Sequence, residues 1–318
     1  MKSVFICCPL LHYKKSIGIM ALVDIGRELS RLGHSVEFVC ILSEYPKEEI
    51  LLVEDAKRVL GESKFLKIQT LADRVCIDLG IRLSTRPDSN DHSLVIYPER
   101  IIENPLRFKN VIRYFGNRDG ALNGGRTVNV GPNDLIVSHS RIVYPNADLY
   151  LFYPSFPVGF EGGNMSVMPH EHRTESITYT GKGHLYGEVS IVEGTVLVTR
   201  ESPPSRVELE HLLAKSKFMF TWDTWSNIIV ESIFFGCVPI LLVNKPFSIE
   251  EIQTSELAPL PIYQASDIFY KNKNFYLKEA IEEAAFDSRR SELIERAYLL
   301  KRNFFASVRE LSSKLSLN

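Results

Sequence analysis

The sequence lacks long apolar runs, a strong net charge and a signal segment, and each absence excludes a class of protein. No apolar run reaches the roughly 18 residues of a membrane-spanning helix, and the run that follows Lys2 is too short for a signal peptide. With 37 Lys and Arg against 39 Asp and Glu, the net charge of −2 provides no basic field for nucleic acid. A hydrophobic content of 45% is typical of a globular chain. We therefore expect a cytoplasmic protein that does not bind nucleic acid.

Cysteine and histidine are too scattered to predict a metal site. The chain has five cysteines, an odd number, all in apolar runs without metal-ligand spacing: Cys7, Cys8, Cys40, Cys76 and Cys237. We expect them to be buried thiols. The eight histidines provide one ligand-like cluster, His170-Glu171-His172, which has no further partner at metal-site spacing. The sequence predicts no metal ligands.

The alternation of strand and helix patterns predicts two α/β domains. A length of 318 residues, at about 150 per domain, suggests two domains. An apolar strand at residues 4–8, a helical pattern from Ile17 that stops at Gly33, and a second strand at 36–42 form a βαβ unit with a parallel sheet. We expect residues 1–155 to form an N-terminal Rossmann-like domain.

The rest of this domain is less regular. Helix is predicted over residues 48–60 and strand over 93–97, 135–137 and 149–152, with a Gly- and Asn-rich loop over 116–132. Four apolar residues at positions i, i+3, i+4 and i+7 predict a helix on the core: Phe108, Val111, Ile112 and Phe115.

Six cations surround that predicted helix, against two acids, Glu103 and Asp119. They are Arg100, Arg107, Lys109, Arg113, Arg118 and Arg126. A basic helix face is suited to anionic lipid, which would place the protein at the inner face of a membrane. The alternative is an ordinary solvated helix.

Proline and glycine crowd residues 154–169 and predict a linker. Beyond it, strands are expected at 176–180, 196–199, 218–221 and 238–243, helices at 206–214 and 225–235, and a final helical tail at 277–317. Residues 156–318 should therefore form a C-terminal Rossmann-like domain.

The window from Glu208 to Leu241 is the most informative, because it reads as strand, polar turn and helix. Ligands bind at such strand ends in open α/β sheets. The backbone N–H groups of the helix start, with Ser226 and Asn227, are suited to a phosphate oxygen. Glu231 lies one turn inside this apolar helix, where a carboxylate needs hydrogen-bond donors such as ribose hydroxyls.

This window resembles GT-B glycosyltransferases, particularly the retaining nucleotide-sugar enzymes of glycosyltransferase family 4. Their hallmark is an acidic residue, seven others, Glu on a helix, and a turn of small residues; here these are Asp223, Glu231 and Gly236-Cys237-Val238-Pro239. The family usually has Glu where this chain has Asp223. Residues 24–34, which end in Gly33-His34, are similar to the family's first acceptor-domain helix.

The resemblance implies a GT-B-like α/β fold, in which two Rossmann-like domains face each other across a cleft and the final helix returns to the first. It implies sugar transfer from a nucleotide-sugar donor, held by the second domain, to a saccharide or lipid-linked saccharide of the bacterial surface. It implies a retaining reaction without a cofactor. The chain contains no Asp-x-Asp pair, so we expect no metal.

The resemblance also implies site residues. Asp223 would orient the donor sugar and Glu231 the ribose, while Lys182, in Thr180-Gly181-Lys182-Gly183, and Arg200 would neutralise the diphosphate. His139 would contact the donor sugar from the first domain.

Gly18 is a candidate for close approach of substrate and Glu99 for acceptor contact. Each of these residues has a plain structural alternative: a surface charge, a helix cap or a helix-entry glycine. Two rival functions also stay open, a sugar-nucleotide epimerase of the same fold and a catalytically silent GT-B-like binding subunit.

Overall fold

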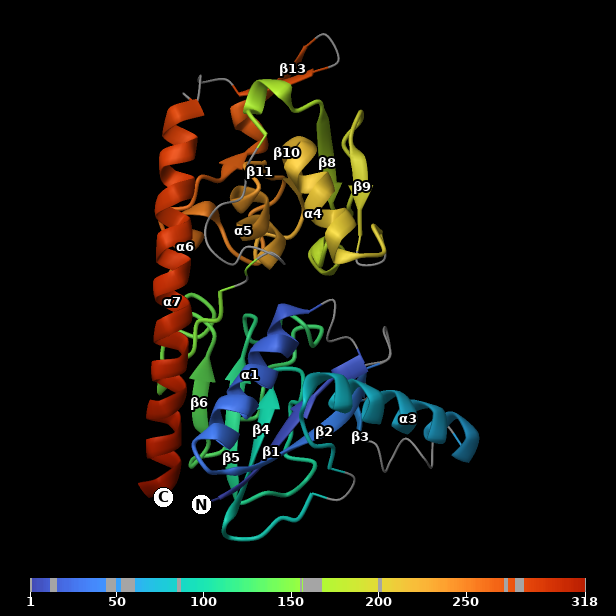
Figure 1. Cartoon of the computed structure of the whole chain (residues 1–318), viewed down its shortest axis with the longest axis vertical. Helices are drawn as coiled ribbons and strands as arrows, with labels where there is room; N and C mark the ends of the chain where they lie inside the picture. The colour runs from blue at the N-terminus through green and yellow to red at the C-terminus, as the bar shows by residue number, and fades with distance from the viewer. Residues whose placement is uncertain are drawn as a thin grey trace. The chain divides into compact units, whose positions relative to one another are not determined.

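The chain folds into two compact α/β units, Met1–Tyr153 with Arg302–Asn318, and Pro154–Lys301 (Figure 1). The computed structural model describes residues 2–11, 16–43, 50–52, 61–84, 87–154, 156, 168–199, 202–271, 274–277 and 283–317. Each unit has its own, mainly parallel sheet. The prediction of an α/β fold with two Rossmann-like units is therefore confirmed.

The first sheet has seven strands in the order β3-β2-β1-β4-β5-β6-β7. Its strands are β1 (Ser3–Cys8), β2 (Ser35–Ser43), β3 (Ile50–Leu52), β4 (Ser93–Pro98), β5 (Asn110–Phe115), β6 (Leu135–Ser138) and β7 (Leu149–Tyr150). All neighbours are parallel except β2 and β3. Because the chain adds β2 on one side of β1 and β4 on the other, the strand order reverses between β1 and β4.

One face of this sheet packs on helices α1 (Ile17–Arg31) and α3 (Glu62–Leu79) and on the end of α7 (Glu283–Leu317). Helix α1 lies close to the sheet because Gly26 has no side chain: a Cβ there would lie 2.5 Å from Phe38 Cζ. The helix ends before Gly33, whose φ of +94° is costly for other residues. The buried residues of α7 in this core follow a helical spacing: Phe304, Val308, Leu311 and Leu315.

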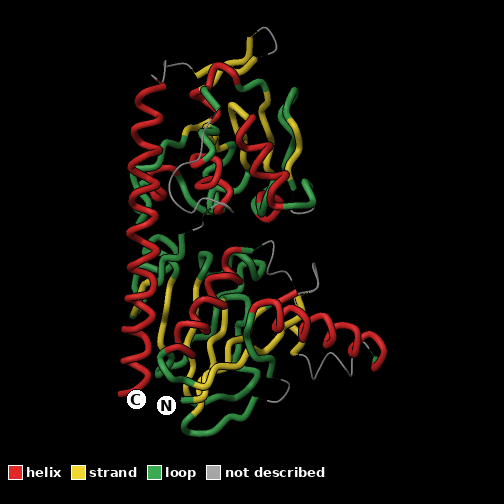
Figure 2. Tube along the Cα trace, in the orientation of Figure 1, coloured by secondary structure: helices red, strands yellow, loops and turns green. Residues whose placement is uncertain are grey.

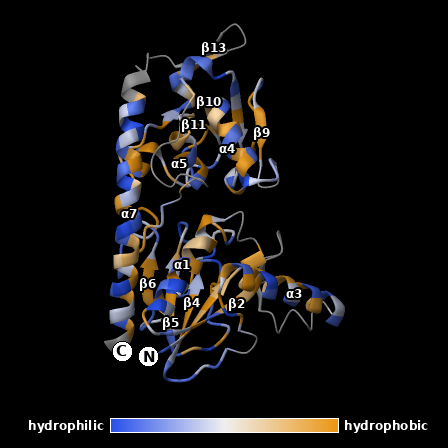
Figure 3. Ribbon diagram, in the orientation of Figure 1, coloured by the Kyte–Doolittle hydropathy of each residue, from blue (hydrophilic) through white to orange (hydrophobic). Residues whose placement is uncertain are grey.

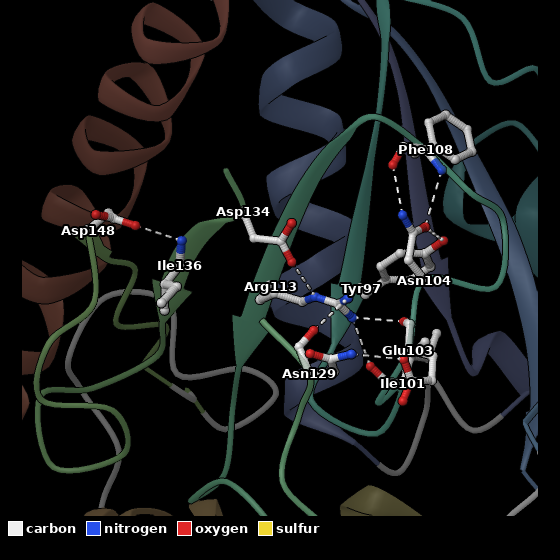
Figure 4. Close-up of polar contacts among 10 residues, drawn as sticks. All are labelled: Tyr97, Ile101, Glu103, Asn104, Phe108, Arg113, Asn129, Asp134, Ile136 and Asp148. Carbon is white, nitrogen blue, oxygen red and sulfur yellow. Dashed lines mark hydrogen bonds and ion pairs between the residues drawn. The ribbon is translucent and has the colours of Figure 1, made fainter. Parts of the chain in front are cut away.

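The opposite face is covered by loops, which connect β4, β5 and β6 where Figure 2 shows no helix. Arg113, in the middle of β5, is 3% exposed and holds these loops (Figure 4). Its Nε donates to Asp134 Oδ2 at 2.9 Å, and its guanidinium lies over the ring of Tyr97. Its other nitrogens donate to three backbone carbonyl oxygens, those of Ile101, Glu103 and Asn129.

Two sequence predictions for this unit are wrong. Residues 110–115 form strand β5, not a helix, because a strand buried between β4 and β6 needs apolar residues on both faces, and such a run also fits a helical stripe. The cations around it therefore share no helix face, and Arg113 is buried. Of the helix predicted at 48–60, residues 50–52 are a strand and the rest lies outside the described residues.

The second sheet has five parallel strands in the order β12-β11-β10-β8-β9. They are β8 (Glu175–Tyr179), β9 (Val196–Val198), β10 (Ser216–Thr221), β11 (Val238–Leu241) and β12 (Tyr263–Gln264). The connecting helices are α4 (Arg206–Lys215), α5 (Asn227–Phe234) and α6 (Ile249–Ile252), with 3₁₀ turns at η2 (His170–His172), η3 (Gly183–Leu185) and η4 (Ala265–Asp267). Strands β13 (Ile268–Lys271) and β14 (Asn274–Leu277) form a separate hairpin. The strand order of this sheet reverses between β8 and β10.

Helix α5 is buried on every side, as its apolar sequence requires. Two arginines satisfy carbonyl groups at its carboxyl end: Arg173 donates to Phe235 O and Arg290 to Phe234 O, both at 2.7 Å. Cations at this end also complement the helix dipole. The amino end of α5 then faces the strand ends.

Helix α7 has residues in both units, with the division after Lys301. Hydrophilic and hydrophobic residues alternate along it in Figure 3, and its residues in the core of the first unit recur at helical spacing. Within the first unit, Ser312 Oγ lies 2.8 Å from His34 Nε2, and Arg309 Nε donates to Glu28 Oε1 at 3.4 Å.

All five cysteines are free and buried, which confirms the sequence prediction. Burial raises the pKa of the Cys40 and Cys237 thiols to about 12, so they are unreactive. In the described parts of the chain, no helix is both long and apolar enough to cross a membrane.

Candidate functional site

The carboxyl ends of β8 and β10 lie side by side where the order of the second sheet reverses. Residues 180–183 follow β8, and residues 222–226 connect β10 to α5. In open α/β sheets, ligands bind outside the carboxyl ends of the strands at such a reversal. The topology brings together four residues singled out from the sequence: Lys182, Asp223, Ser226 and Asn227.

Asp223 lies at the contact between these two loops and is fully buried. Its Oδ2 accepts a hydrogen bond from the Lys182 backbone N–H at 3.1 Å, and its Oδ1 accepts one from the Trp225 N–H at 3.3 Å. The hydroxyl of Thr221 bonds both the N–H and the carbonyl of Asp223. The carboxylate thus joins the loop after β8 to the loop after β10.

Lys182 extends from the β8 loop towards the start of α5. Its Nζ donates to the Trp225 carbonyl oxygen at 2.9 Å and lies 3.8 Å from Asp223 Oδ1. Trp225 immediately precedes Ser226, the N-cap residue of α5. The ammonium group therefore adds positive charge beside the positive end of the helix dipole, which favours an anion.

The first turn of α5 begins at Asn227, after Ser226 in extended conformation. The Ser226 side chain makes no capping hydrogen bond, and its Oγ lies 3.5 Å from the hydroxyl of Tyr179, the last residue of β8. Tyr179 was not predicted as a site residue. Its place at the end of a strand was the signal that could have identified it.

Glu231, one turn inside α5, is buried and paired with an arginine that the sequence did not indicate. Arg206 Nη2 lies 2.6 Å from Glu231 Oε1, and Arg206 Nε donates to Glu210 Oε1 at 3.1 Å. Burial alone would lower the pKa of Arg206, but the two carboxylates raise it overall, so the guanidinium stays charged. The pair joins the first turn of α4 to α5.

The remaining predicted residues lie elsewhere. Arg200 is outside the described residues. His139 belongs to the first unit, directly after β6, where its ring stacks on Phe152 at 4.5 Å and its Nδ1 accepts from the Tyr153 N–H. Gly18 lies in the first turn of α1; a Cβ there would meet only Ser16 Oγ, at 3.8 Å, so packing does not require glycine.

Glu99 follows β4, next to the reversal in the first sheet. Its side chain is buried and accepts hydrogen bonds from the Gly116 N–H at 3.2 Å and from Asn117 Nδ2 at 2.6 Å. Glu99 therefore fixes the loop that follows β5.

Among the residues that the structure describes, no three or more His, Cys, Asp or Glu side chains lie close enough together to hold a metal ion. His170, Glu171 and His172 form a 3₁₀ turn.

Comparison with known proteins gave distant structural likenesses and no sequence match. No protein-family model and no curated protein matches the chain. The chain is similar to the solved structure of glycosyltransferase SnogD from Streptomyces nogalater, with 14% identity, a TM-score of 0.41 and coverage of 100% of this chain and 99% of that one.

Two further structures are similar at the same level. Spinosyn rhamnosyltransferase SpnG, complexed with thymidine diphosphate, has 10% identity, a TM-score of 0.35 and coverage of 100% and 96%. T4 phage BGT, complexed with UDP-glucose, has 10% identity, a TM-score of 0.37 and coverage of 99% and 96%. TM-scores below 0.5 assign neither activity nor substrate to this chain.

Proposed function

We propose that the chain is a GT-B-type glycosyltransferase that takes a sugar from a nucleotide-sugar donor. The observation that carries this proposal is the second unit's site between β8 and β10, where the Lys182 ammonium lies beside the start of α5. A diphosphate is the kind of anion that this arrangement favours. The acid-x7-Glu spacing of Asp223 and Glu231 supports the same assignment.

The proposed role of this site is to stabilise the leaving group. Transfer breaks the bond between the anomeric carbon and the diphosphate oxygen, and negative charge grows on that oxygen. Lys182 and the N–H groups of α5 would bind this charge more tightly in the transition state than in the donor. Arg200 is proposed as a second cation, and the reaction as retaining and independent of metal.

The acceptor is proposed to be a glycan or lipid-linked saccharide of the bacterial surface, bound by the first unit near Gly18 and Glu99, while His139 is proposed to contact the donor sugar. Glu99 and His139 follow strands β4 and β6, at the edge of the sheet where ligands bind. Membrane contact is not part of the proposal, because the element that predicted it is the buried strand β5.

Ligand-induced thermal stabilisation tests the donor site. The melting temperature is measured with UDP-, GDP-, dTDP- and CMP-sugars at rising concentration, since a ligand at about 100 times its Kd stabilises the protein by about 2.7 kcal/mol. Lys182→Ala should weaken the stabilisation. The matched control is Lys215→Ala, which removes an exposed lysine from the carboxyl end of α4. This variant should be stabilised by the ligand as much as the parent is. No stabilisation of the parent, or equal loss in both variants, would contradict the proposal.

Turnover separates the proposal from the two rival functions. A glycosyltransferase consumes donor only when a saccharide acceptor is present. Release of free or isomerised sugar without an acceptor would favour the epimerase. Unchanged donor after long incubation with varied acceptors, despite measurable nucleotide binding, would favour the silent binding subunit.

A further inference from the structure

The carboxylate of Asp223 is enclosed by its own chain. Its side chain is 1% exposed, and both oxygens are in use: Oδ2 by the Lys182 N–H, and Oδ1 by the Trp225 N–H with the Lys182 ammonium close by. A donor sugar could reach either oxygen only by displacing groups of the loops that carry Lys182 and Trp225.

The glycine before Lys182 makes this enclosure tight. Gly181 has a φ of +48°, and a Cβ on it would lie 2.6 Å from Asp223 Oδ2 and 2.7 Å from Asp223 Cβ. Next in the loop, a Cβ on Gly183 would lie 2.4 Å from Trp222 Cβ. Real Cβ atoms do not approach other atoms so closely, so the two loops pack without room for a ligand between them.

Asp223 contacts Lys182 at two points of that residue, the backbone N–H and the ammonium. The backbone contact fixes where the lysine leaves the loop, and the ammonium contact fixes where its charge lies, one residue before the N-cap Ser226. We propose that Asp223 is a positioning residue, which places the Lys182 ammonium at the start of α5 for the diphosphate and does not touch the donor sugar. This inference rests on the proposed function.

Comparing ligands with and without the sugar tests the proposal. Calorimetry measures the affinities for UDP and UDP-glucose, GDP and GDP-mannose, or dTDP and dTDP-glucose, whichever pair binds the parent. Asp223→Ala should weaken the diphosphate and its sugar form by the same factor, about 10-fold or more, as expected when a hydrogen-bonded charge is misplaced. If Asp223 touched the sugar, only the sugar form would bind more weakly.

A double-mutant cycle identifies the residue through which Asp223 acts. Because Asp223 is proposed to act through Lys182, adding Asp223→Ala to Lys182→Ala should lower diphosphate affinity by no more than about twofold further. Losses that multiply would overturn the proposal. Gly181→Ala places a methyl group against Asp223 and so separates the two loops. It should weaken binding of the diphosphate and of its sugar form by the same factor.

Folding is checked for every variant by circular dichroism and thermal melting. Should Asp223→Ala fail to fold, Asp223→Asn replaces it, because the amide oxygen can still accept from the Lys182 N–H while the negative charge is lost. Equal weakening of both ligand forms by Asp223→Asn supports the positioning role, whereas weakening of the sugar form alone, or unchanged affinity for both forms, overturns it. If the folded parent binds none of the diphosphates, the proposed function fails and the inference with it.

Discussion

Replacing Arg113 by methionine should destabilise the first unit more than any exposed substitution nearby. Methionine fills similar space but leaves Asp134, 11% exposed, without its ion-pair partner, and three backbone carbonyls without a donor. Removing one partner of a buried, hydrogen-bonded ion pair costs about 3–5 kcal/mol. With an m-value of about 2 kcal/mol/M, the urea midpoint of this unit should fall by about 1.5–2.5 M.

The two tryptophans allow the units to be followed separately, since Trp222 and Trp225 both lie in the second unit. Tryptophan fluorescence should report a nearly unchanged urea transition of the second unit, while far-ultraviolet circular dichroism should show the earlier loss of the first.

Lys109→Met is the matched control for Arg113→Met. It removes a cation next to the same strand, from a pair with Asp91 that is 3.2 Å long and in which the two side chains are 75% and 78% exposed. Its urea transition should stay close to that of the parent, because solvent screens exposed pairs. Equal midpoints for the two variants would refute the argument that Arg113 holds the loops over this face.

Four further predictions follow from the structure. Gly26→Ala should destabilise the first unit by about 1–3 kcal/mol through overpacking, whereas Gly18→Ala on the same helix should stabilise it by about 0.5–1 kcal/mol in thermal melts. Burial lowers the pKa of His34, so the unfolded chain takes up this proton first. Stability should therefore fall as the pH drops below about 6.5, and urea titrations at pH 7.5 and 5.5 should show a weaker dependence for His34→Gln. Glu231→Gln, which removes a carboxylate from Arg206, should lower the melting temperature and weaken nucleotide-sugar binding by about 1.5–3 kcal/mol; unchanged calorimetric affinity would make Glu231 purely structural. Sugar transfer should persist in EDTA, and loss of activity that Mg²⁺ or Mn²⁺ restores would disprove a metal-free mechanism.

Local sequence patterns predicted the helices and strands that bury only one face, or that end at a residue such as glycine that does not continue the element. The first βαβ unit was predictable because an amphipathic helix that ends at Gly33 lies between two short apolar runs. Strand β5 was not, because a central strand is apolar on both faces and its residues also satisfy a helical period. Arg113 was predicted to lie on a basic helix face, in contact with anionic lipid or with solvent, since the sequence gives no sign that Asp134 would lie beside it.

The same distinction applies to the candidate site. Lys182, Asp223, Ser226 and Asn227 could be proposed from the sequence because each lies in the short loop after a strand or at the start of a helix, where a resembled family has its site residues, and parallel strands bring such positions together. The pairing of Arg206 with Glu231 depends on how α4 packs on α5, which no local pattern encodes. Enclosure of the Asp223 carboxylate likewise depends on the close approach of Gly181, from a loop far away in the sequence.

Helix α7 has a consequence for the order in which the protein folds during its synthesis. The core of the first unit includes Phe304, Val308, Leu311 and Leu315, so that core is incomplete until residues 302–317 have left the ribosome. Every residue of the second unit, by contrast, precedes Arg302 in the chain. The nascent chain can therefore finish its second unit first, while residues 1–153 expose the apolar surface that α7 later covers. A chain cut after Lys301 would lack this segment of α7, and the apolar surface of residues 1–153 would stay exposed to solvent.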